Sequence, residues 1–568
     1  MQTHTRRTVL GASIVAVGSG ILTACSGSAP RSEPGSHPAG SSYARPAPRP
    51  APGSRPGTGT AGNHGEVFVP RGPAGYVNPS DPEVLEAERE RGQGPVRRFR
   101  LTAGETFLDL GGLMVRSWAY NDRLPGREVR IHAGDILDLT LANRLPRSTT
   151  LHSHGVRMRC DMDGVPGLTQ RSIRSGEDFN YRFAVTHPGT YWLHSHSGLQ
   201  LDRGLYAPLI VEDPREPLSY DKEWVVVLDD WLDGVQGSTP DRVLAELRHG
   251  KRAPMGMDMG DDEEHGGGHD GSGHETWDEA GDWDPGRPKS PSRLLHDSHS
   301  RMLHSDGGSV DYPFYLVNGR LAHDPSVFRA RPGDRIRLRI INAGAETAFR
   351  VALGGHEMTV THTDGYPCEH KRTDALLLGM AERYDVLITA KDGVFPLVAL
   401  AEGKDGRAMA VLRTSGGGLP RSSVHPDELE GKTVPARRLV PDESVALCHR
   451  EPDREMRIRL TGNMKAFNWG FDHRPYSVEE RRPVRQGERV RLTLINATDM
   501  WHPVHLHGHT FALRGLDGLG ARKDTSILLP HRKMVVDFNA DNPGLWMLHC
   551  HNQYHSESGM MTILGYRK

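Results

Sequence analysis

Cysteine is scarce in this chain, with 5 residues among 568, and that number excludes a disulfide-stabilised scaffold. Neither sign of charge prevails, because 70 Lys and Arg oppose 72 Asp and Glu and leave a formal net charge of -2. No long-range field therefore attracts the folded chain to nucleic acid or to an anionic membrane surface. A single apolar run approaches membrane-spanning length and lies at the extreme N-terminus, which excludes a polytopic membrane protein.

Aromatic residues are also few, at 6%, whereas the 31 histidines outnumber the 13 Phe and 14 Tyr together. Short runs of Val, Ile, Leu and Thr alternate with Gly, Pro and Asn turns, and long amphipathic helices are scarce. This pattern predicts an all-β fold of β-sandwich domains. At roughly 150 residues per domain, the length suggests three or four of them.

The N-terminus has the features of an export signal. Residues 1–25 carry Arg6 and Arg7 ahead of a modest apolar run and end in Leu-Thr-Ala-Cys25, so they resemble a twin-arginine signal with a lipoprotein cleavage site. A plain secretory signal that contains a cysteine is the alternative. Residues 26–90, rich in Pro, Gly and Ser up to residue 65, are expected to form a disordered tether. We therefore expect an exported protein, anchored by an acylated Cys25 to the outer face of the cytoplasmic membrane.

One stretch of sequence occurs three times with the same internal spacing. Residues 134–143, 333–342 and 487–496 each begin with a Gly-Asp or Gly-Glu turn, continue as an alternating strand and close with Asn. Three copies predict three homologous domains. We place them at residues 91–215, 216–430 and 431–568.

The repeat also locates the chemistry. Nine residues after the closing Asn stand His152 in the first domain and His505 in the third, each followed two residues later by another histidine. The same offsets in the second domain give Val351 and Leu353, so that domain is interpreted as a spacer without a site. Two His-x-His pairs in each of the outer domains result: His152 and His154, His194 and His196, His505 and His507, and His549 and His551. Alternation along a strand places both members of a pair on one face.

Copper is the metal that this set favours. Imidazole alone suits Cu, Zn, Fe and Ni, but Cys550 lies between His549 and His551. His502 lies upstream of Cys550, His555 follows it by five residues and Met560 by ten. Two histidines, a thiolate and a weak thioether are the donors of a blue-copper site, whereas tetrahedral zinc would gain nothing from a thioether.

Four motifs carry a resemblance to a known family. HSHG (152–155), HSH (194–196), HPVHLHGH (502–509) and HCHNQYHSESGM (549–560) resemble the four copper-binding segments of three-domain multicopper oxidases, and the likeness covers about residues 95–568. The resemblance implies three cupredoxin-like Greek-key sandwiches and four copper ions. It further implies that four one-electron oxidations of substrate are coupled to reduction of dioxygen to water, with electrons passing from Cys550 to its neighbours His549 and His551.

Carried over position by position, the resemblance also implies the copper ligands. The type 1 copper would be held by His502, Cys550, His555 and Met560. The type 2 copper would be held by His152 and His505. The type 3 pair would be held by His154, His194 and His551 on one ion and by His196, His507 and His549 on the other.

Two acidic residues are candidates for proton supply. Asp163 matches the acidic residue that family members place near the type 2 copper, although an Asp-Gly turn is the alternative. Many laccase-like members carry Glu directly after the second type 1 histidine, where this chain has Ser556 followed by Glu557. Glu557 is therefore the nearest candidate for a proton relay.

Several features favour Cu(I) as a substrate beside phenols or aromatic amines. An insertion at 250–305 carries Met255, Met257 and Met259 with nearby acids and histidines, and thioethers bind Cu(I); a solvated Gly-rich insertion is the alternative. Asp499 and Met500 precede His502 and are expected to dock a cuprous ion, unless Met500 is a packing residue. We predict an oxidase that serves copper tolerance. A broad-specificity laccase and a copper-sequestering protein without turnover are the alternatives.

The remaining cysteines, Cys160, Cys368 and Cys448, permit at most one disulfide among them. Their spacing does not choose a pair, and buried thiols are an equal alternative. The sequence indicates no oligomeric state.

Overall fold

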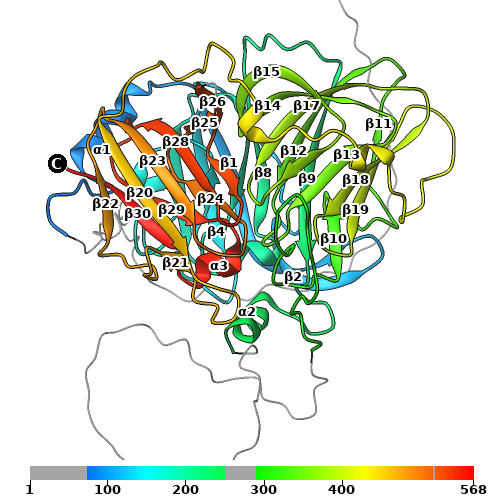
Figure 1. Ribbon diagram of the computed structural model, residues 1–568, viewed down its shortest axis with the longest axis horizontal. Helices are drawn as coiled ribbons and strands as arrows, with labels where there is room; N and C mark the ends of the chain where they lie inside the picture. The colour runs from blue at the N-terminus through cyan, green and yellow to red at the C-terminus, as the bar shows by residue number, and fades with distance from the viewer. Residues whose placement is uncertain (1–72, 250–289, 516–517) are drawn as a thin grey trace, which may run out of the picture. The chain divides into compact units, whose positions relative to one another are not determined.

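The structure is a computed structural model that describes residues 73–249, 290–515 and 518–568 (Figure 1). The predicted signal, most of the predicted tether and the insertion's Met255, Met257 and Met259 lie outside the described residues. The described helices are α1 (Pro82–Glu90), α2 (Pro240–His249) and α3 (Gln553–Glu557), with short 3-10 turns η1 (Cys160–Met162), η2 (Leu201–Arg203), η3 (Asp427–Glu430) and η4 (Ala436–Arg438). Within the described ranges, no helix is long and apolar enough to cross a membrane.

Six sheets form three pairs, which we call the first, second and third sandwich. The first sandwich has the sheets β2-β1-β4-β6 and β3-β8-β7-β5. Its strands are β1 (Val96–Asp109), β2 (Met114–Tyr120), β3 (Val129–His132), β4 (Ile136–Asn143), β5 (His152–His154), β6 (Asp178–Ala184), β7 (Gly189–His194) and β8 (Tyr206–Glu212).

The second sandwich has the sheets β10-β9-β12-β17-β14-β15 and β11-β19-β18-β13-β16. Its strands are β9 (Lys222–Trp231), β10 (Phe314–Val317), β11 (Val327–Arg329), β12 (Arg335–Asn342), β13 (Phe349–Leu353), β14 (Met358–Thr363), β15 (Tyr366–Thr373), β16 (Leu376–Leu378), β17 (Arg383–Thr389), β18 (Val394–Ala401) and β19 (Arg407–Arg413).

The third sandwich has the sheets β21-β20-β23-β28-β25-β26 and β22-β30-β29-β24-β27. Its strands are β20 (Arg454–Thr461), β21 (Gly470–Phe471), β22 (Arg481–Val484), β23 (Arg489–Asn496), β24 (His502–Leu506), β25 (Phe511–Gly515), β26 (Gly518–Lys523), β27 (Thr525–Leu528), β28 (Lys533–Asn539), β29 (Leu545–Cys550) and β30 (Met561–Tyr566). Among the described residues, no strand of one sandwich joins a sheet of another. The predicted all-β fold is confirmed.

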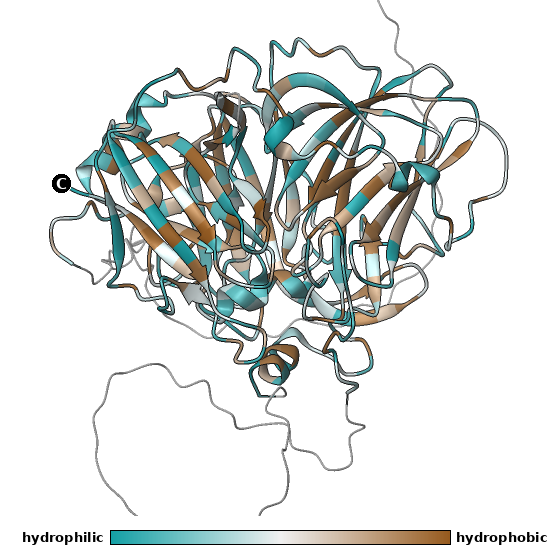
Figure 2. Ribbon diagram, in the orientation of Figure 1, coloured by the Kyte–Doolittle hydropathy of each residue, from teal (hydrophilic) through white to brown (hydrophobic). Residues whose placement is uncertain are grey.

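The strands owe their orientation to alternating hydrophobicity. On β23, Val490, Leu492 and Leu494 are buried while Arg491 and Thr493 between them are partly exposed, and Figure 2 shows hydrophobic and hydrophilic residues interspersed along such strands. Successive side chains of a strand point to opposite faces, so this pattern directs one face of the strand toward the core.

The folded part begins earlier than the sequence analysis placed it. The predicted tether ran to residue 90, but Val77 N–H donates to the Tyr566 carbonyl at 2.8 Å, and helix α1 buries Val84 and Ala87. Pro at its first turn and two apolar residues three apart suffice for this short amphipathic helix. Residues 73–90 therefore belong to the folded part of the chain.

The Asn that closes each repeat ties the end of its strand to the following turn. Asn143, Asn342 and Asn496 are each at most 1% exposed. Each side-chain amide donates to at least two backbone carbonyls, and each side-chain oxygen accepts from the backbone N–H two residues on. Three buried hydrogen bonds explain why the same residue stands at this position of all three copies.

We predict that Asn342→Ala destabilises the fold by about 2–4 kcal/mol, because it leaves buried backbone groups unpaired. The measurement is the urea-unfolding midpoint of the variant beside that of Asn180→Ala, which removes an exposed amide that bonds only Asp138. Equal midpoints for the two variants would contradict the structural role given to Asn342.

Candidate metal centre

The four His-x-His pairs come together because of strand pairing. Strand β5 pairs with β7, which places His152 opposite His194. Strand β24 pairs with β29, which places His505 opposite His549. The first and third sandwiches therefore each contribute two histidine-bearing segments to one location.

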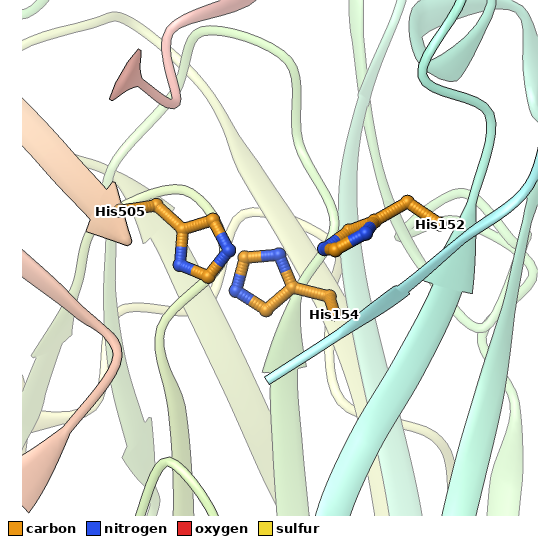
Figure 3. A group of neighbouring side chains, drawn as sticks. All are labelled: His152, His154 and His505. Atoms are coloured by element: carbon orange, nitrogen blue, oxygen red, sulfur yellow. The ribbon is translucent and has the colours of Figure 1, made fainter. Parts of the chain in front are cut away.

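The structure gathers these histidines into groups whose ring nitrogens lie within 4.8 Å of one another. The groups are His152, His154 and His505; His154, His194 and His551; and His196, His507 and His549. Figure 3 shows the first of them, with the ring of His154 between those of His152 and His505. The ring centroids of His154 and His505 are 3.8 Å apart. All eight histidines of the sequence prediction thus share one centre, the histidine centre, between the first and third sandwiches.

The chemistry of the histidine centre suits a bound metal cation. Buried polar atoms are rarely left without a partner, yet the centre holds many such nitrogens. They are His152 Nε2, His154 Nδ1, His194 Nε2, His196 Nε2, His505 Nε2 and both ring nitrogens of His551. Burial lowers the pKa of His194, His507 and His549 well below its usual value. Burial thus favours the neutral form of these three rings, which is the form that binds metals.

A second group lies on the opposite face of the same strands. Alternation along β29 and β24 directs Cys550 and His502 away from His549 and His505. Cys550 Sγ lies 3.5 Å from His502 Nδ1 and 3.7 Å from His555 Nδ1, and the two nitrogens are 3.2 Å apart. His502, Cys550 and His555, which we call the Cys550 group, lie close enough together to hold a single metal ion. Burial raises the pKa of the Cys550 thiol, and a bound cation would be needed to hold it as thiolate.

Met560 is linked to the Cys550 group through its backbone. Its N–H donates to the His555 carbonyl at 3.0 Å, and its carbonyl accepts from the Cys550 N–H at 3.1 Å. Its side chain is fully buried. The structure therefore brings Met560 beside the three other residues predicted to form the type 1 site.

Aromatic side chains that the sequence analysis did not single out enclose the Cys550 group. The Trp469 ring lies 4.3 Å from that of His555 and 5.3 Å from that of His502. Both histidines are completely buried. Thr498 Oγ1 lies 2.9 Å from His502 Nε2, which orients the ring so that its other nitrogen faces Cys550.

Asp163 lies where the sequence analysis expected an acid, and it contacts two histidines. His507 Nδ1–H donates to Asp163 Oδ2 at 2.9 Å, and His152 Nδ1–H donates to the Asp163 carbonyl at 2.7 Å. Its carboxylate is fully buried. Asp163 therefore sets the orientation of one predicted type 3 ligand and one predicted type 2 ligand.

Asp524 is a second buried acid at the histidine centre, and sequence reasoning missed it. Its carboxylate Oδ1 accepts from His154 Nε2 at 3.1 Å, and its carbonyl accepts from His505 Nδ1 at 2.9 Å. Arg383 of the second sandwich donates to both carboxylate oxygens at 2.7 Å. Burial alone would raise the pKa of Asp524, but Arg383 and His154 hold it well below its usual value. The three sandwiches thus meet at this carboxylate.

Helix α3, which carries His555, is held by residues of all three sandwiches. Asn552 caps the helix, since its side chain accepts from the N–H groups of Tyr554 and His555. Glu346 of the second sandwich accepts from the Asn552 amide at 3.4 Å and from Lys404 Nζ at 2.6 Å. The Tyr554 hydroxyl donates to Asp202 of the first sandwich at 2.6 Å. These contacts fix His555 relative to Cys550.

Neither Asp499 nor Glu557 is a member of these groups. Asp499 has a carboxylate that is 93% exposed and bonds His531 at 2.8 Å, whereas Met500 is 2% exposed and packs in the core. The Met500 side chain therefore does not share the surface position of Asp499. The Glu557 carbonyl accepts from Arg248 at 2.6 Å, and burial raises the pKa of its carboxyl to about 7.

The remaining described cysteines form no disulfide. Cys160 and Cys368 are buried thiols and Cys448 is an exposed one. The alternative of buried thiols therefore describes Cys160 and Cys368, whereas Cys448 is free but exposed.

Comparisons with known proteins agree with this geometry. Family models described as multicopper oxidase match residues 103–216, 276–417 and 449–567. The chain is 45% identical over 485 residues to Multicopper oxidase MmcO of Mycobacterium tuberculosis, covering 85% of this chain and 90% of that protein. It is 28% identical over 581 residues to a Copper resistance protein A homolog of Pseudomonas syringae pv. tomato, covering 85% of this chain and 93% of that protein.

The fold is similar to a solved structure as well. Fet3p, described as a multicopper oxidase that functions in iron import, matches with a TM-score of 0.66 at 22% identity, covering 83% of this chain and 90% of that chain. This likeness supports cupredoxin-like sandwiches. The buried histidines, the thiol group beside them and the matches along the chain lead to one conclusion: the chain belongs to the multicopper oxidase family and is a copper-binding oxidase.

Proposed function

We propose that this protein is an exported oxidase that couples oxidation of Cu(I), and of phenolic or amine substrates, to reduction of dioxygen, in the service of copper tolerance. One observation carries the proposal: Cys550 belongs to a group able to hold one ion, while both of its sequence neighbours belong to the histidine centre. Similarity to a Copper resistance protein A homolog supports the role in copper tolerance. Export and an acyl anchor at Cys25 remain proposals from the N-terminal sequence.

The copper ligands are proposed as the sequence analysis assigned them. His502, Cys550, His555 and Met560 would hold the type 1 ion. His152 and His505 would hold the type 2 ion. His154, His194 and His551, with His196, His507 and His549, would hold the type 3 pair. Copper at these positions supplies single-electron exchange between Cu(I) and Cu(II), which is the chemistry needed to join one-electron donors to a four-electron acceptor.

The protein's own residues carry out three tasks around the copper. The peptide bonds of Cys550 with His549 and His551 join the two sites by the shortest covalent path available to electrons. Asp163 orients His507 and His152 and is the acid proposed to supply protons at the histidine centre. The raised pKa of Glu557, about 7, suits a proton-exchanging group, and we propose it as the acid that stands in for the family's Glu at Ser556.

The electron donor is the second part of the proposal. An exposed carboxylate at Asp499, next to the turn that leads to His502, offers an oxygen ligand and a negative charge to an approaching cuprous ion. A broad-specificity laccase is the alternative, and oxygen uptake driven by Cu(I) distinguishes the two.

Replacement of the thiol tests the core of the proposal. Cys550→Ser is expected to lose the blue absorption band of the copper-loaded protein and to reduce oxygen uptake to background, because a hydroxyl does not replace the thiolate. The control is Cys448→Ser, at an exposed thiol. A blue band that survives in Cys550→Ser would disprove the type 1 assignment.

Asp524→Asn is expected to weaken copper binding at the histidine centre by about 10–100-fold, since it removes the carboxylate that orients His154. The measurement is copper per chain after dialysis against a graded chelator. Asp537→Asn is the matched control, because Asp537 is also buried and pairs with Arg491 and Arg514 but contacts no histidine ligand. Equal copper loss in both variants would mean that Asp524 acts only through stability.

Asp499→Asn is expected to raise the KM for Cu(I) by about threefold to tenfold, because an exposed carboxylate attracts the cation, and to leave the KM for a neutral phenol unchanged. Initial rates of oxygen uptake under conditions that suppress autoxidation provide the comparison. Glu479→Gln, which removes another exposed negative charge of the third sandwich, is the control. An unchanged KM for Cu(I) would remove Asp499 from the substrate path.

A further inference from the structure

A cavity of about 720 Å³ lies between the second and third sandwiches. Its walls come from β16 and β17 on one side, from β25, β27 and β28 on the other, and from residues 433–437, which connect the two sandwiches. The volume is that of a site for a small organic molecule. None of the predicted copper ligands lines this cavity.

The unpaired charges around the cavity are all positive. Arg437, Arg532 and Lys533 line it, and among the described residues none of the three forms an ion pair or a side-chain hydrogen bond. A fourth cation, Arg514, is neutralised by Asp537 at 2.8 Å, and the single acid of the lining, Glu382, pairs with Lys523 at 3.2 Å. Three unpaired cations are therefore available to a ligand, in a chain whose overall formal charge is -2.

The interior surface of the cavity is apolar. Leu377, Val434, Ile527 and Leu529 contribute to its lining, and Val434 is 7% exposed. An apolar interior with a cationic rim selects a ligand that combines a flat hydrophobic body with an anionic group. Met302, Met534 and His304 also line the cavity and would suit Cu(I), but the three unpaired cations oppose the entry of a metal cation.

The cavity lies one strand away from the Cys550 group. Strand β27, which supplies Ile527 and Leu528 to its lining, pairs with β24 in a register that places Leu528 opposite His502. Neighbouring strands are about 4.8 Å apart. Strand β27 is therefore the one strand that separates a molecule in this part of the cavity from the strand that carries His502.

We propose that this cavity binds small aromatic anions and that phenols bearing a carboxylate are the preferred aromatic reductants of the enzyme. The ring packs on Ile527 and Leu529, and the carboxylate faces Arg437, Arg532 and Lys533. The inference rests on the proposed function for the redox step. Each phenol loses one electron and its hydroxyl proton to become a phenoxyl radical, and four electrons with four protons reduce one dioxygen to two waters.

The matched pair syringate and methyl syringate tests the proposal, because the two phenols differ by one carboxylate charge. In Arg437→Glu holoenzyme, the KM for syringate is expected to rise about tenfold with kcat retained, while the KM for methyl syringate stays within about twofold. The control is Arg438→Glu, the same charge change at the adjacent exposed residue, which does not line the cavity. Equal effects of the two substitutions would overturn the proposal, since a general surface field would then account for the preference.

Binding is measured separately with naphthoate, which is anionic and aromatic but has no phenol to oxidise. Titration calorimetry of the holoenzyme is expected to give saturable binding that weakens about tenfold in Arg532→Gln/Lys533→Gln and is unchanged in Arg438→Glu. No saturable binding, or tighter binding of Ag(I) than of naphthoate at this cavity, would overturn the proposal. Naphthoate binding without oxygen uptake from either phenol would refute the proposed oxidation of phenols and, with it, the assignment of these anions as reductants.

Discussion

The architecture of both proposed copper sites depends on the alternation of side chains along one strand. On β29, Cys550 points to one face of its sheet, and His549, with His551 just beyond the strand, points to the other. The strand thus forms the wall between the Cys550 group and the histidine centre and is at the same time the covalent connection between them. Strand β24 repeats the arrangement, with His502 on one face and His505 on the other. Its pairing with β29 places His505 opposite His549.

The second sandwich contributes charge to these sites, although the proposed ligand set takes nothing from it. Arg383 reaches Asp524, and the Glu346–Lys404 pair reaches Asn552, the cap of helix α3. Buried ion pairs contribute little net stability because their desolvation offsets their attraction, but removal of one partner is costly. Displacement of the second sandwich would separate Arg383 from Asp524 and would break the hydrogen bond from Asn552 to Glu346. The second sandwich therefore helps to fix the position of the third sandwich, which carries half of the histidine centre.

Local sequence patterns predicted the repeats, the all-β fold and the residues that gather in the two groups, because strand alternation and His-x-His spacing are local properties. The pattern could not predict Asp524 or Arg383, since Asp524 lies 370 residues from His154 and 141 from Arg383 and no spacing rule relates them. Composition placed the end of the tether too late in the sequence. The two buried apolar residues of α1, Val84 and Ala87, are too few to indicate a folded segment. Burial of Met500 was likewise decided by tertiary packing.

The carboxylate of Asp524 has a further consequence for the order of events during synthesis of the chain. The groups that meet around it come from the beginning, the middle and the end of the sequence, so a fragment that lacks either outer sandwich cannot complete the histidine centre. Such a fragment would offer a copper ion only half of the histidines of the centre. The histidine centre is therefore complete only when the whole chain has folded.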